Sequence, residues 1–444
     1  MILIELWDFK KVKAESFYRI KKKEELKMIL YHIADLHIGK SIYGRSMLED
    51  QRDWVEKFLA KCDEKRPDAV LIAGDVYDRS NPSGEAMELV GNFLSELDDR
   101  DIPVFMIAGN HDGGEKVDYL RSILVKQNIH VSGKINREIE HFTMENPDGN
   151  GPVTFWLVPY IFPERISSLL DDDSIRTYTD AMKKYLEIQN IDKTHRNVIL
   201  SHQNVVNNGV EVERGGSETM VGGVGQIEYT VYDDFEYVAL GHIHSGFSVG
   251  RREVRYAGTP LCYHFDETKH DKKGYVEVTL GAKGEEVKTE LVEIKPFHKM
   301  RYIEGSKNNV IKKVEEGVGN GEYVGIVIND MRLTPEIASY LASIVESREG
   351  VLLYKDSSYS EFSNNGASAD RKSVNEKAVE DLFSDFYRSQ TGDLIPTDEE
   401  YALMHMLGEL VRNSDATREN DEKNVDKLLN KLLTEYNNGE EGKV

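Results

Sequence analysis

The sequence predicts an α/β fold, and three observations carry this prediction. Between residue 28 and about residue 290, short apolar runs rich in β-branched residues alternate with patterns typical of amphipathic helices. These runs have the length of buried strands. Polar residues follow most of them directly, at the carboxyl ends where α/β sheets bind their ligands. Five of the runs are AVLIAGD, VFMIAGN, VTFWLVPY, NVILSHQ and YVALGHIH.

The first predicted strand, MILYHIAD, covers residues 28–35 and begins with its own methionine, Met28. Residues 1–27 form an N-terminal extension that we expect to lie outside the fold. Its basic stretch KKKEELK is either an arm that contacts a nucleic acid or another partner, or the product of an upstream start of translation. The second explanation is favoured.

Two amphipathic helices are predicted between the first three strands. Ser46 is the expected N-cap of one helix, and Pro82-Ser83 opens the other. We expect both apolar stripes to pack on the core of a domain that ends near residue 295. The stripes contain Leu48, Val55, Phe58, Leu59 and Cys62 in the first helix, and Ala86, Met87, Val90, Phe93, Leu94 and Leu97 in the second.

After Pro296 the pattern changes to strand, helix, strand, helix, strand, and residues 296–356 are predicted to form a small separate α/β module. Residues 357–372 are polar and poor in hydrophobic residues, which is typical of a linker. Residues 373–440 are predicted to be helical, with capping-box patterns at Ser373 and Thr397. These helices either dock in a groove of a partner or pack on the preceding domain, and the residues alone favour neither.

The composition limits the classes of function. A formal net charge of −23 argues against a broad surface that coats nucleic acid, although bound divalent cations can reverse the potential of one site. The two cysteines, Cys62 and Cys262, match neither a metal-ligand spacing nor a disulfide framework. No apolar run has the length of a membrane span, and the first residues lack a signal-peptide pattern. We therefore expect a soluble cytoplasmic protein.

Seven candidate metal ligands stand at or just beyond five predicted strand ends. If strand geometry continues, the i and i+2 residues of the Asp35-x-His37 and His242-x-His244 motifs point to the same side. A carboxylate such as Asp75 can bridge two cations through its two oxygens. The seven residues are Asp35, His37, Asp75, Asn110, His202, His242 and His244.

Mixed oxygen and imidazole ligands favour Mn²⁺, Fe²⁺ or Zn²⁺ over Ca²⁺, and the absence of thiolate ligands argues against a structural zinc. We expect two Mn²⁺ ions, which together can activate a nucleophile and stabilise an in-line displacement at phosphorus. His111 follows Asn110 and need not be a ligand. Its imidazole can protonate the leaving oxygen or stabilise the developing negative charge.

Each short motif is weak evidence alone, because a single buried histidine is more often a hydrogen-bonded core residue than a ligand. The ordered set is stronger evidence. A structural explanation would need many buried polar residues, each costly unless paired, to coincide in one order. The set therefore predicts a dinuclear phosphoesterase centre.

The ordered series D-x-H, G-D, G-N-H-D, H and G-H-x-H resembles the pattern of the calcineurin-like metallophosphoesterase superfamily. The resemblance implies a four-layer α-β-β-α sandwich with a small capping domain and C-terminal helices. It also implies a catalytic, non-ligand role for His111. The implied ligands are Asp35, His37, Asp75 and His244 for one metal, and Asp75, Asn110, His202 and His242 for the other.

Longer strings resemble one branch of this superfamily, the nuclease subunits of bacterial DNA repair and recombination complexes and their archaeal and eukaryotic counterparts. The resemblance is strong over residues 28–300. Members of this branch usually start near the first strand, as Met28 would here. The strings are DLHIGK, AGDVYDRSNPSGEAMEL, AGNHD, YVALGHIH, RYAGTPLCYHFDE and KKGYVEVTL.

This branch implies an ATP-dependent 3′–5′ exonuclease on double-stranded DNA and an endonuclease on single strands and hairpins. It also implies that residues 373–440 bind a coiled-coil ATPase, in a heterotetramer of two nuclease and two ATPase subunits, and that the nuclease domain can form a homodimer. The glycine-rich run 215–225 lacks the Lys-Ser/Thr of a P-loop, so we expect a mobile loop there and ATP binding by the partner.

Two other functions remain open. A phosphodiesterase or phosphatase for small substrates would use the same dinuclear centre. A non-catalytic scaffold would retain the fold with a vestigial site, although the intact ligand set argues against it.

Overall fold

The computed structural model describes residues 27–119, 121–145, 147–208, 225–269 and 272–359. Its largest sheet has six strands in the order β15-β14-β1-β4-β5-β6. Strands β1, β4, β5 and β6 are parallel, and β14 and β15 continue the sheet in antiparallel register. The strands are β1 Met28–Ile33, β4 Ala69–Ala73, β5 Val104–Ile107, β6 Ile129–Ser132, β14 Gly274–Leu280 and β15 Lys288–Glu293.

A second sheet has five strands in the order β13-β12-β9-β8-β7. All neighbouring pairs are parallel except β7 and β8, which are antiparallel. The strands are β7 Glu140–Met144, β8 Val153–Val158, β9 Arg196–His202, β12 Tyr237–Gly241 and β13 Val254–Tyr256. Two short ladders complete this part, formed by β2 Ser41–Ile42 with β3 Arg45–Ser46, and by β10 Asn204–Val206 with β11 Gln226–Glu228.

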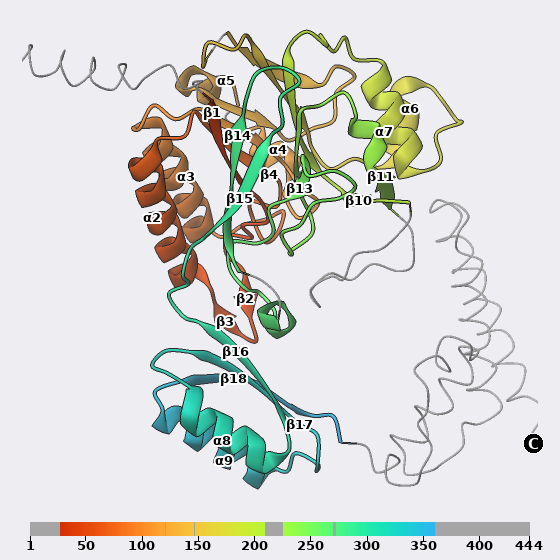
Figure 1. Ribbon diagram of the computed structural model, residues 1–444. Helices are drawn as coiled ribbons and strands as arrows, with labels where there is room; N and C mark the ends of the chain where they lie inside the picture. The colour runs from red at the N-terminus through yellow and green to blue at the C-terminus, as the bar shows by residue number, and fades with distance from the viewer. Residues whose placement is uncertain (1–26, 120, 146, 209–224, 270–271, 360–444) are drawn as a thin grey trace, which may run out of the picture. The chain divides into compact units, whose positions relative to one another are not determined.

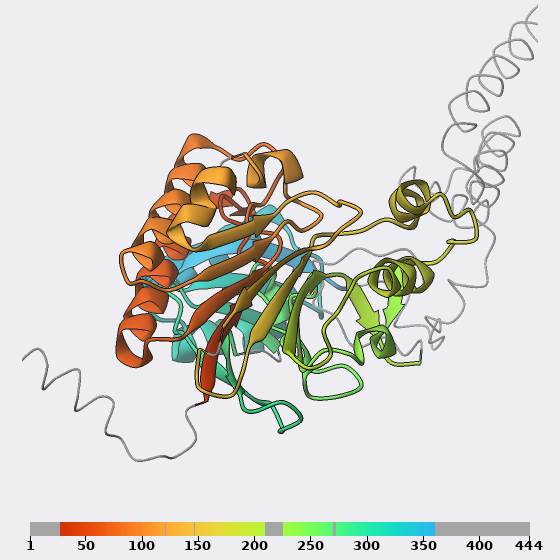
Figure 2. The same cartoon turned by 90° about the horizontal axis from the view of Figure 1, so that it is seen from above.

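The two sheets pack face to face, with helices on both outer faces (Figures 1 and 2). Alternation along each strand produces this arrangement. In β1, Leu30 belongs to the apolar cluster between the sheets, whereas Tyr31 and Ile33 face the helices α2 Leu48–Lys65 and α3 Gly84–Asp98. The helices α6 Pro163–Leu170 and α7 Tyr178–Glu187 cover the second sheet.

The result is the four-layer α-β-β-α sandwich, so the predicted α/β fold is confirmed. Both predicted apolar stripes pack on the first sheet, around Trp54, Phe58 and Phe93. Between β5 and β6 the chain forms only short helical turns, α4 Gly114–Val117, α5 Arg121–Leu124 and η1 Val125–Gln127.

The predicted N-cap at Ser46 is wrong. Helix α2 begins at Leu48 after Met47, which makes no side-chain cap, because Ser46 is held in extended conformation by its pairing with Ser41. Ser83 does cap α3, and its Oγ accepts a hydrogen bond from the Ala86 amide.

A third sheet, with the order β16-β17-β18, lies in the C-terminal part of the described chain. Its elements follow the predicted order of strand, helix, strand, helix, strand. They enclose an apolar cluster of their own that includes Val310, Val314, Ile326, Leu341 and Val345. The elements are β16 Met300–Gly305, α8 Lys307–Gly317, β17 Tyr323–Ile328, α9 Pro335–Ser347 and β18 Val351–Ser357.

Several predictions concern residues outside the described part: the N-terminal extension apart from Lys27, most of the glycine-rich run, the linker beyond Tyr359, and the helices of residues 373–440. The first residue of the predicted linker, Ser357, is instead the last residue of β18. No helix of the described part is long and apolar enough to cross a membrane.

Candidate metal centre

Parallel strands of both sheets end at one edge of the sandwich, and the candidate ligands stand at this edge. Strand β9 contains His202 as its last residue, whereas the other candidates lie in the loops that follow β1, β4, β5 and β12. These loops carry Asp35 and His37, Asp75, Asn110 and His111, and His242 and His244, respectively.

Strand alternation does not orient the D-x-H and H-x-H motifs, and this expectation is corrected. Strand β1 ends at Ile33, and both Asp35 and His37 have left-handed backbone conformations, with φ of 52° and 44°. Strand β12 ends before His242, whose φ is 96°. Hydrogen bonds hold the first loop in place: the Asp35 amide donates to Gly74 O at 3.0 Å and the His37 amide to Asp75 O at 2.9 Å.

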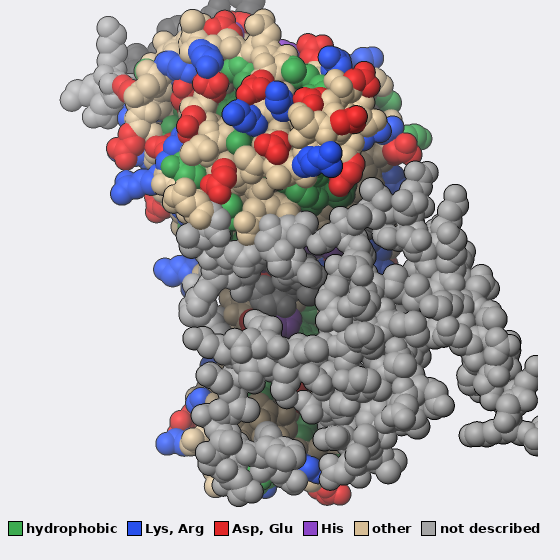
Figure 3. Space-filling model, turned by 90° about the vertical axis from the view of Figure 1, so that its right-hand side faces the viewer, with side chains coloured by type: hydrophobic (Ala, Val, Ile, Leu, Met, Phe, Trp, Pro, Cys, Tyr) green, Lys and Arg blue, Asp and Glu red, His purple; other side chains and the backbone are tan. Residues whose placement is uncertain are grey.

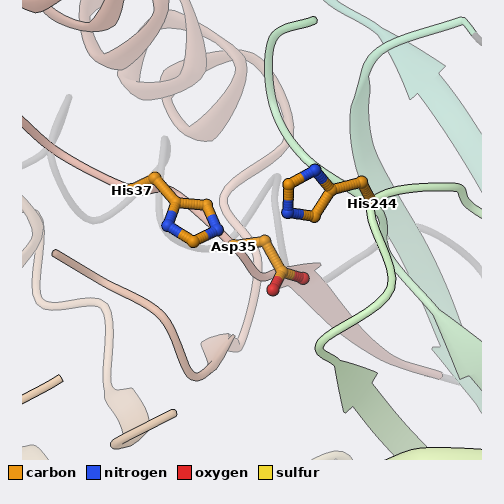
Figure 4. Close-up of side chains that lie close together, drawn as sticks. All are labelled: Asp35, His37 and His244. Atoms are coloured by element: carbon orange, nitrogen blue, oxygen red, sulfur yellow. The ribbon is translucent and has the colours of Figure 1, made fainter. Parts of the chain in front are cut away.

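The first group of potential ligands is Asp35, His37 and His244, whose ligand-capable atoms all lie within 4.8 Å of one another. Figure 4 shows the two imidazole rings on either side of Asp35. All three residues are buried. Both ring nitrogens of His37 are buried without a hydrogen-bond partner. Because a buried polar atom without a partner is costly, the group fits a bound cation.

The second group is Asp35, Asp75 and His202, again within 4.8 Å. His202 Nδ1 donates to the Ala73 carbonyl at 2.8 Å. The other nitrogen of the neutral ring, Nε2, is therefore the one with a free lone pair, and it lies 3.4 Å from Asp75 Oδ2. A carbonyl-bound Nδ1 is the usual arrangement of a metal-binding histidine.

Asn110 and His242 complete the second group. Asn110 Oδ1 lies 3.1 Å from His202 Nε2 and 3.0 Å from His242 Nδ1. The His242 amide donates to both carboxylate oxygens of Asp35, at 3.0 and 3.1 Å. The structure thus brings all seven predicted residues into one cluster.

Asp75 lies between the two groups. Its Oδ2 is 3.7 Å from His37 Nε2 and 4.0 Å from His111 Nε2, and its Oδ1 accepts a hydrogen bond from the His111 amide at 2.9 Å. With His202 on the other side, this carboxylate touches residues from both groups. It is the best placed of the candidates to bridge two cations.

The glycines of the motifs permit these close approaches. A Cβ at Gly74 would collide with the His202 ring, and a Cβ at Gly109 would collide with the Asp75 carboxylate. A Cβ at Gly241 would meet both Ala73 O and His202. The motifs G-D, G-N-H-D and G-H therefore require glycine for packing as well as the polar residues for chemistry.

The buried carboxylates compete for positive charge. Burial raises the pKa of Asp35 to about 7, and His202 only partly opposes this effect. Burial also disfavours the charged form of His202, yet Asp75 and Asp35 outweigh it and raise the His202 pKa to about 9. The His202 and His37 rings lower the Asp75 pKa despite its burial. A divalent cation would stabilise both carboxylates in their ionised form.

His111 differs from the other histidines of the cluster because its side chain is 44% exposed. Its Nδ1 lies 3.1 Å from Asp78 O, and its ring centroid lies 5.0 Å from that of His37. The imidazole thus reaches the rim of the centre from the solvent side, where it can exchange a proton with a bound substrate.

Asp112 is a site residue for which the G-N-H-D motif alone predicted no role. Its buried carboxylate accepts hydrogen bonds from the amides of Gly109, Val76 and Tyr77, at 2.8, 3.1 and 2.9 Å. It therefore ties the loop after β5 to the loop after β4. Burial, together with the charge of Asp75, raises the pKa of Asp112 to about 6.

The visible face in Figure 3 carries no large field of one sign. Lys and Arg side chains are interspersed with Asp and Glu on the coloured part of this face. The view agrees with the acidic composition in giving no broad basic surface there. A strong attraction for anions would arise at the metal centre itself.

Comparison with known proteins relates this centre to phosphoesterases. Residues 28–246 match the family model described as calcineurin-like phosphoesterase. The chain is 27% identical over 385 residues to a curated protein of Staphylococcus saprophyticus subsp. saprophyticus that is named as the SbcD component of the nuclease SbcCD. The match covers 86% of this chain and 99% of that relative. It therefore extends well beyond the segment that contains the candidate ligands.

Two solved structures show a weaker similarity. The crystal structure of TT1561 from Thermus thermophilus has a TM-score of 0.35 and 12% identity, and covers 60% of this chain and 99% of its own. A dimetal phosphatase from Danio rerio has a TM-score of 0.34 and 14% identity, and covers 59% of this chain and 98% of its own. Such low TM-scores support no conclusion about the fold or the chemistry.

Proposed function

Residues 28–246 form a calcineurin-like phosphoesterase domain, and from this premise we propose that the protein is the nuclease subunit of an SbcC–SbcD-type DNA repair and recombination complex. The coarser conclusion, a hydrolase similar to a nuclease subunit, follows from the comparisons. The observation that carries the finer proposal is Asp75, whose carboxylate touches both groups of potential ligands.

Two divalent ions, which we propose to be Mn²⁺, would be held by the seven clustered residues. Asp35, His37, Asp75 and His244 would hold one ion, and Asp75, Asn110, His202 and His242 the other. The unpartnered ring of His37 and the crowded carboxylates support this assignment. When bound, the ions supply a nucleophile at neutral pH and stabilise charge on the phosphoryl oxygens.

His111 would act on the leaving group. Its ring stands at the exposed rim while its amide is fixed by Asp75, so the imidazole has a defined position next to a bound phosphodiester. A neutral ring can bind the substrate and a protonated ring can donate a proton to the departing oxygen. The residue would thus contribute to cleavage without holding a metal.

The proposed substrates are DNA ends, hairpins and single strands, on which the complex would act as an ATP-dependent 3′–5′ exonuclease and an endonuclease. The similarity to a nuclease subunit over 86% of the chain supports this choice. The acidic composition assigns the attraction for DNA to the metals, to a local groove and to the partner complex.

The proposed partner is an SbcC-type coiled-coil ATPase that binds residues 373–440 in a cytoplasmic heterotetramer of two nuclease and two ATPase subunits. The name of the curated relative implies such a partner for that protein. A homodimer of the nuclease domain is also proposed. Three large apolar side chains exposed between β5 and β6, those of Tyr119, Ile123 and Val125, support it.

Cleavage assays with full-length protein test the proposal. With Mn²⁺ and the ATPase partner, we expect degradation of duplex ends and opening of hairpins. A small phosphodiester dye should be a poorer substrate than oligonucleotides. Turnover of the dye without any cleavage of DNA, alone or with the partner, would instead indicate a small-substrate phosphodiesterase.

The variant His111→Ala provides the internal control for this assay. We expect it to bind Mn²⁺ as the wild type does and to lose about 10²- to 10⁴-fold in cleavage rate, the usual contribution of a general acid. DNA binding without cleavage by both the wild type and the variant would identify a scaffold with a vestigial site.

A further inference from the structure

Glu267 is a buried carboxylate directly behind the metal centre. It lies in the 3-10 helix η3 Phe265–Lys269, between β13 and β14, and its side chain has no exposed surface. Its Oε1 lies 3.0 Å from His244 Nδ1. Its Oε2 lies 3.0 Å from Lys273 Nζ and accepts hydrogen bonds from Thr259 Oγ1 at 3.2 Å and from the Tyr263 amide at 3.3 Å.

The contact with Glu267 determines which nitrogen of His244 carries a proton. An ionised carboxylate can only accept hydrogen bonds, so the partner nitrogen Nδ1 must be the donor. In the neutral ring, Nε2 then has the free lone pair that a metal requires. His202 reaches the same state through the Ala73 carbonyl. The two histidines are therefore prepared as ligands by different acceptors, one charged and one neutral.

Lys273 fixes the backbone of His244 as Glu267 fixes its ring. The Lys273 ammonium donates to His244 O at 2.9 Å and to Thr259 Oγ1 at 2.8 Å, while it pairs with Glu267. The Thr259 amide also donates to His244 O, at 3.0 Å. The lysine side chain is only 8% exposed, and each buried charge compensates the other. His244 is thus held at both its main chain and its ring.

The same segment also supports the other histidine of the first group. The Tyr263 hydroxyl donates to Leu36 O at 2.5 Å and accepts from Gln51 Nε2 at 3.1 Å. The Gln51 amide group in turn donates to His37 O at 2.8 Å. The segment from Thr259 to Lys273 therefore connects the loops that carry His37 and His244.

From these contacts we propose that Glu267 is a positioning residue of the reaction, which sets the tautomer and the orientation of the His244 ring for metal binding, with Lys273 as its counterion. The inference rests on the proposed function, in which His244 is a metal ligand. It assigns a role to two strings, RYAGTPLCYHFDE and KKGYVEVTL, whose residues Thr259, Tyr263, Glu267 and Lys273 contain no proposed ligand.

The test is Mn²⁺ binding to full-length, metal-free protein, measured by titration calorimetry. The variant Glu267→Gln keeps the shape and one acceptor oxygen but loses the charge. We expect one of the two sites to bind Mn²⁺ about 10- to 100-fold more weakly, the usual effect of losing such a partner, while the other site is unchanged. Glu267→Ala should show a larger loss at the same site.

Glu277→Gln is the matched control. Glu277 is also a buried glutamate paired with a lysine, Lys65 at 2.7 Å, but it lies in β14. We expect this variant to bind both ions with wild-type affinity. If Glu267→Gln does not fold, the double variant Glu267→Gln/Lys273→Met removes both buried charges together, and the same loss at one site is expected.

Three outcomes overturn the inference. Wild-type affinity at both sites in a folded Glu267→Gln or double variant would remove the positioning role and leave the proposed function intact. An equal loss in Glu277→Gln would show a general effect of charge removal. Absence of Mn²⁺ binding by the wild type would instead refute the metal centre itself, and the inference with it.

Discussion

His202 lies between two buried carboxylates, so its protonation is coupled to metal binding. Asp75 and Asp35 raise its pKa from 6.5 to about 9 in the metal-free protein, against the effect of burial. The stability that this raised pKa contributes is fully present below about pH 6.5 and is lost as the pH rises through about 9. A metal ligand must be deprotonated, so a bound cation has to displace this proton.

We therefore predict that Mn²⁺ binding at neutral pH releases protons and becomes tighter as the pH rises toward 9, the pKa of His202. The heat of binding should depend on the ionisation enthalpy of the buffer. Thermal unfolding of chelator-treated protein should show a falling contribution of His202 to stability over the same pH range. Heats that are independent of the buffer would contradict the prediction.

Gly109 tests how closely the backbone must approach Asp75. A Cβ at this position would collide with the Asp75 carboxylate and its amide nitrogen, so Gly109→Ala must displace one of them. We predict a loss of at least about tenfold in Mn²⁺ affinity and in cleavage, comparable to the loss of a group that orients a ligand.

Gly91→Ala is the control for this substitution. Gly91 is exposed in α3, and a Cβ there would meet no atom within 4 Å. Because alanine is favoured over glycine inside a helix, we expect a gain in stability of roughly 0.5–1 kcal/mol and unchanged metal binding. Loss of metal binding in both variants would show that the effect at Gly109 is not local.

Among the elements, helix α3 is held by a side-chain cap at some distance from the ligands. The Ser83 Oγ accepts from the Ala86 amide at 3.2 Å, and Ala86 is itself fully buried in the core. We predict that Ser83→Ala lowers the free energy of unfolding by about 1 kcal/mol, the usual contribution of an N-cap, without changing Mn²⁺ affinity. Chemical denaturation and calorimetry on the same variant measure the two quantities.

Most elements could be predicted from the sequence because buried strands and helix stripes are local patterns. The five apolar runs ending near Asp75, Asn110, Tyr160, His202 and His242 are all strands in the structure. What failed was local geometry. The left-handed residues after β1 and β12 follow from hydrogen bonds between neighbouring loops, and Ser46 is extended because it pairs with Ser41.

The supporting residues of the site were missed for a similar reason. The acceptor role of Asp112 depends on amides of another loop, and that of Glu267 depends on a ring 23 residues away. Neither contact has a periodic signal in the sequence. The clustering of the seven candidates could be predicted, since the carboxyl ends of parallel strands lie at one edge, but their partners could not.

For the whole molecule, the described part separates from the C-terminal residues. Met1–Tyr359 form one compact unit and Ser360–Val444 another. We predict that a chain ending at residue 359 binds Mn²⁺ and hydrolyses a small phosphodiester as the full chain does, but no longer binds the ATPase partner. Co-purification with the partner and dye turnover measure the two properties.

Retained binding of the ATPase by the shortened chain would contradict the role proposed for residues 373–440. Loss of Mn²⁺ binding would show that the centre needs residues beyond Tyr359. An internal control is the full chain with Glu277→Gln, whose altered side chain lies in β14 within the first unit.

The central claim is a dinuclear centre bridged by Asp75, and the most direct measurement is the number of Mn²⁺ ions bound per chain. The account predicts two ions per wild-type chain, with magnetic coupling between them in electron paramagnetic resonance, and fewer than two in Asp75→Asn. A wild-type chain that binds one ion or none, or an Asp75→Asn variant that binds two coupled ions with wild-type affinity, would contradict it.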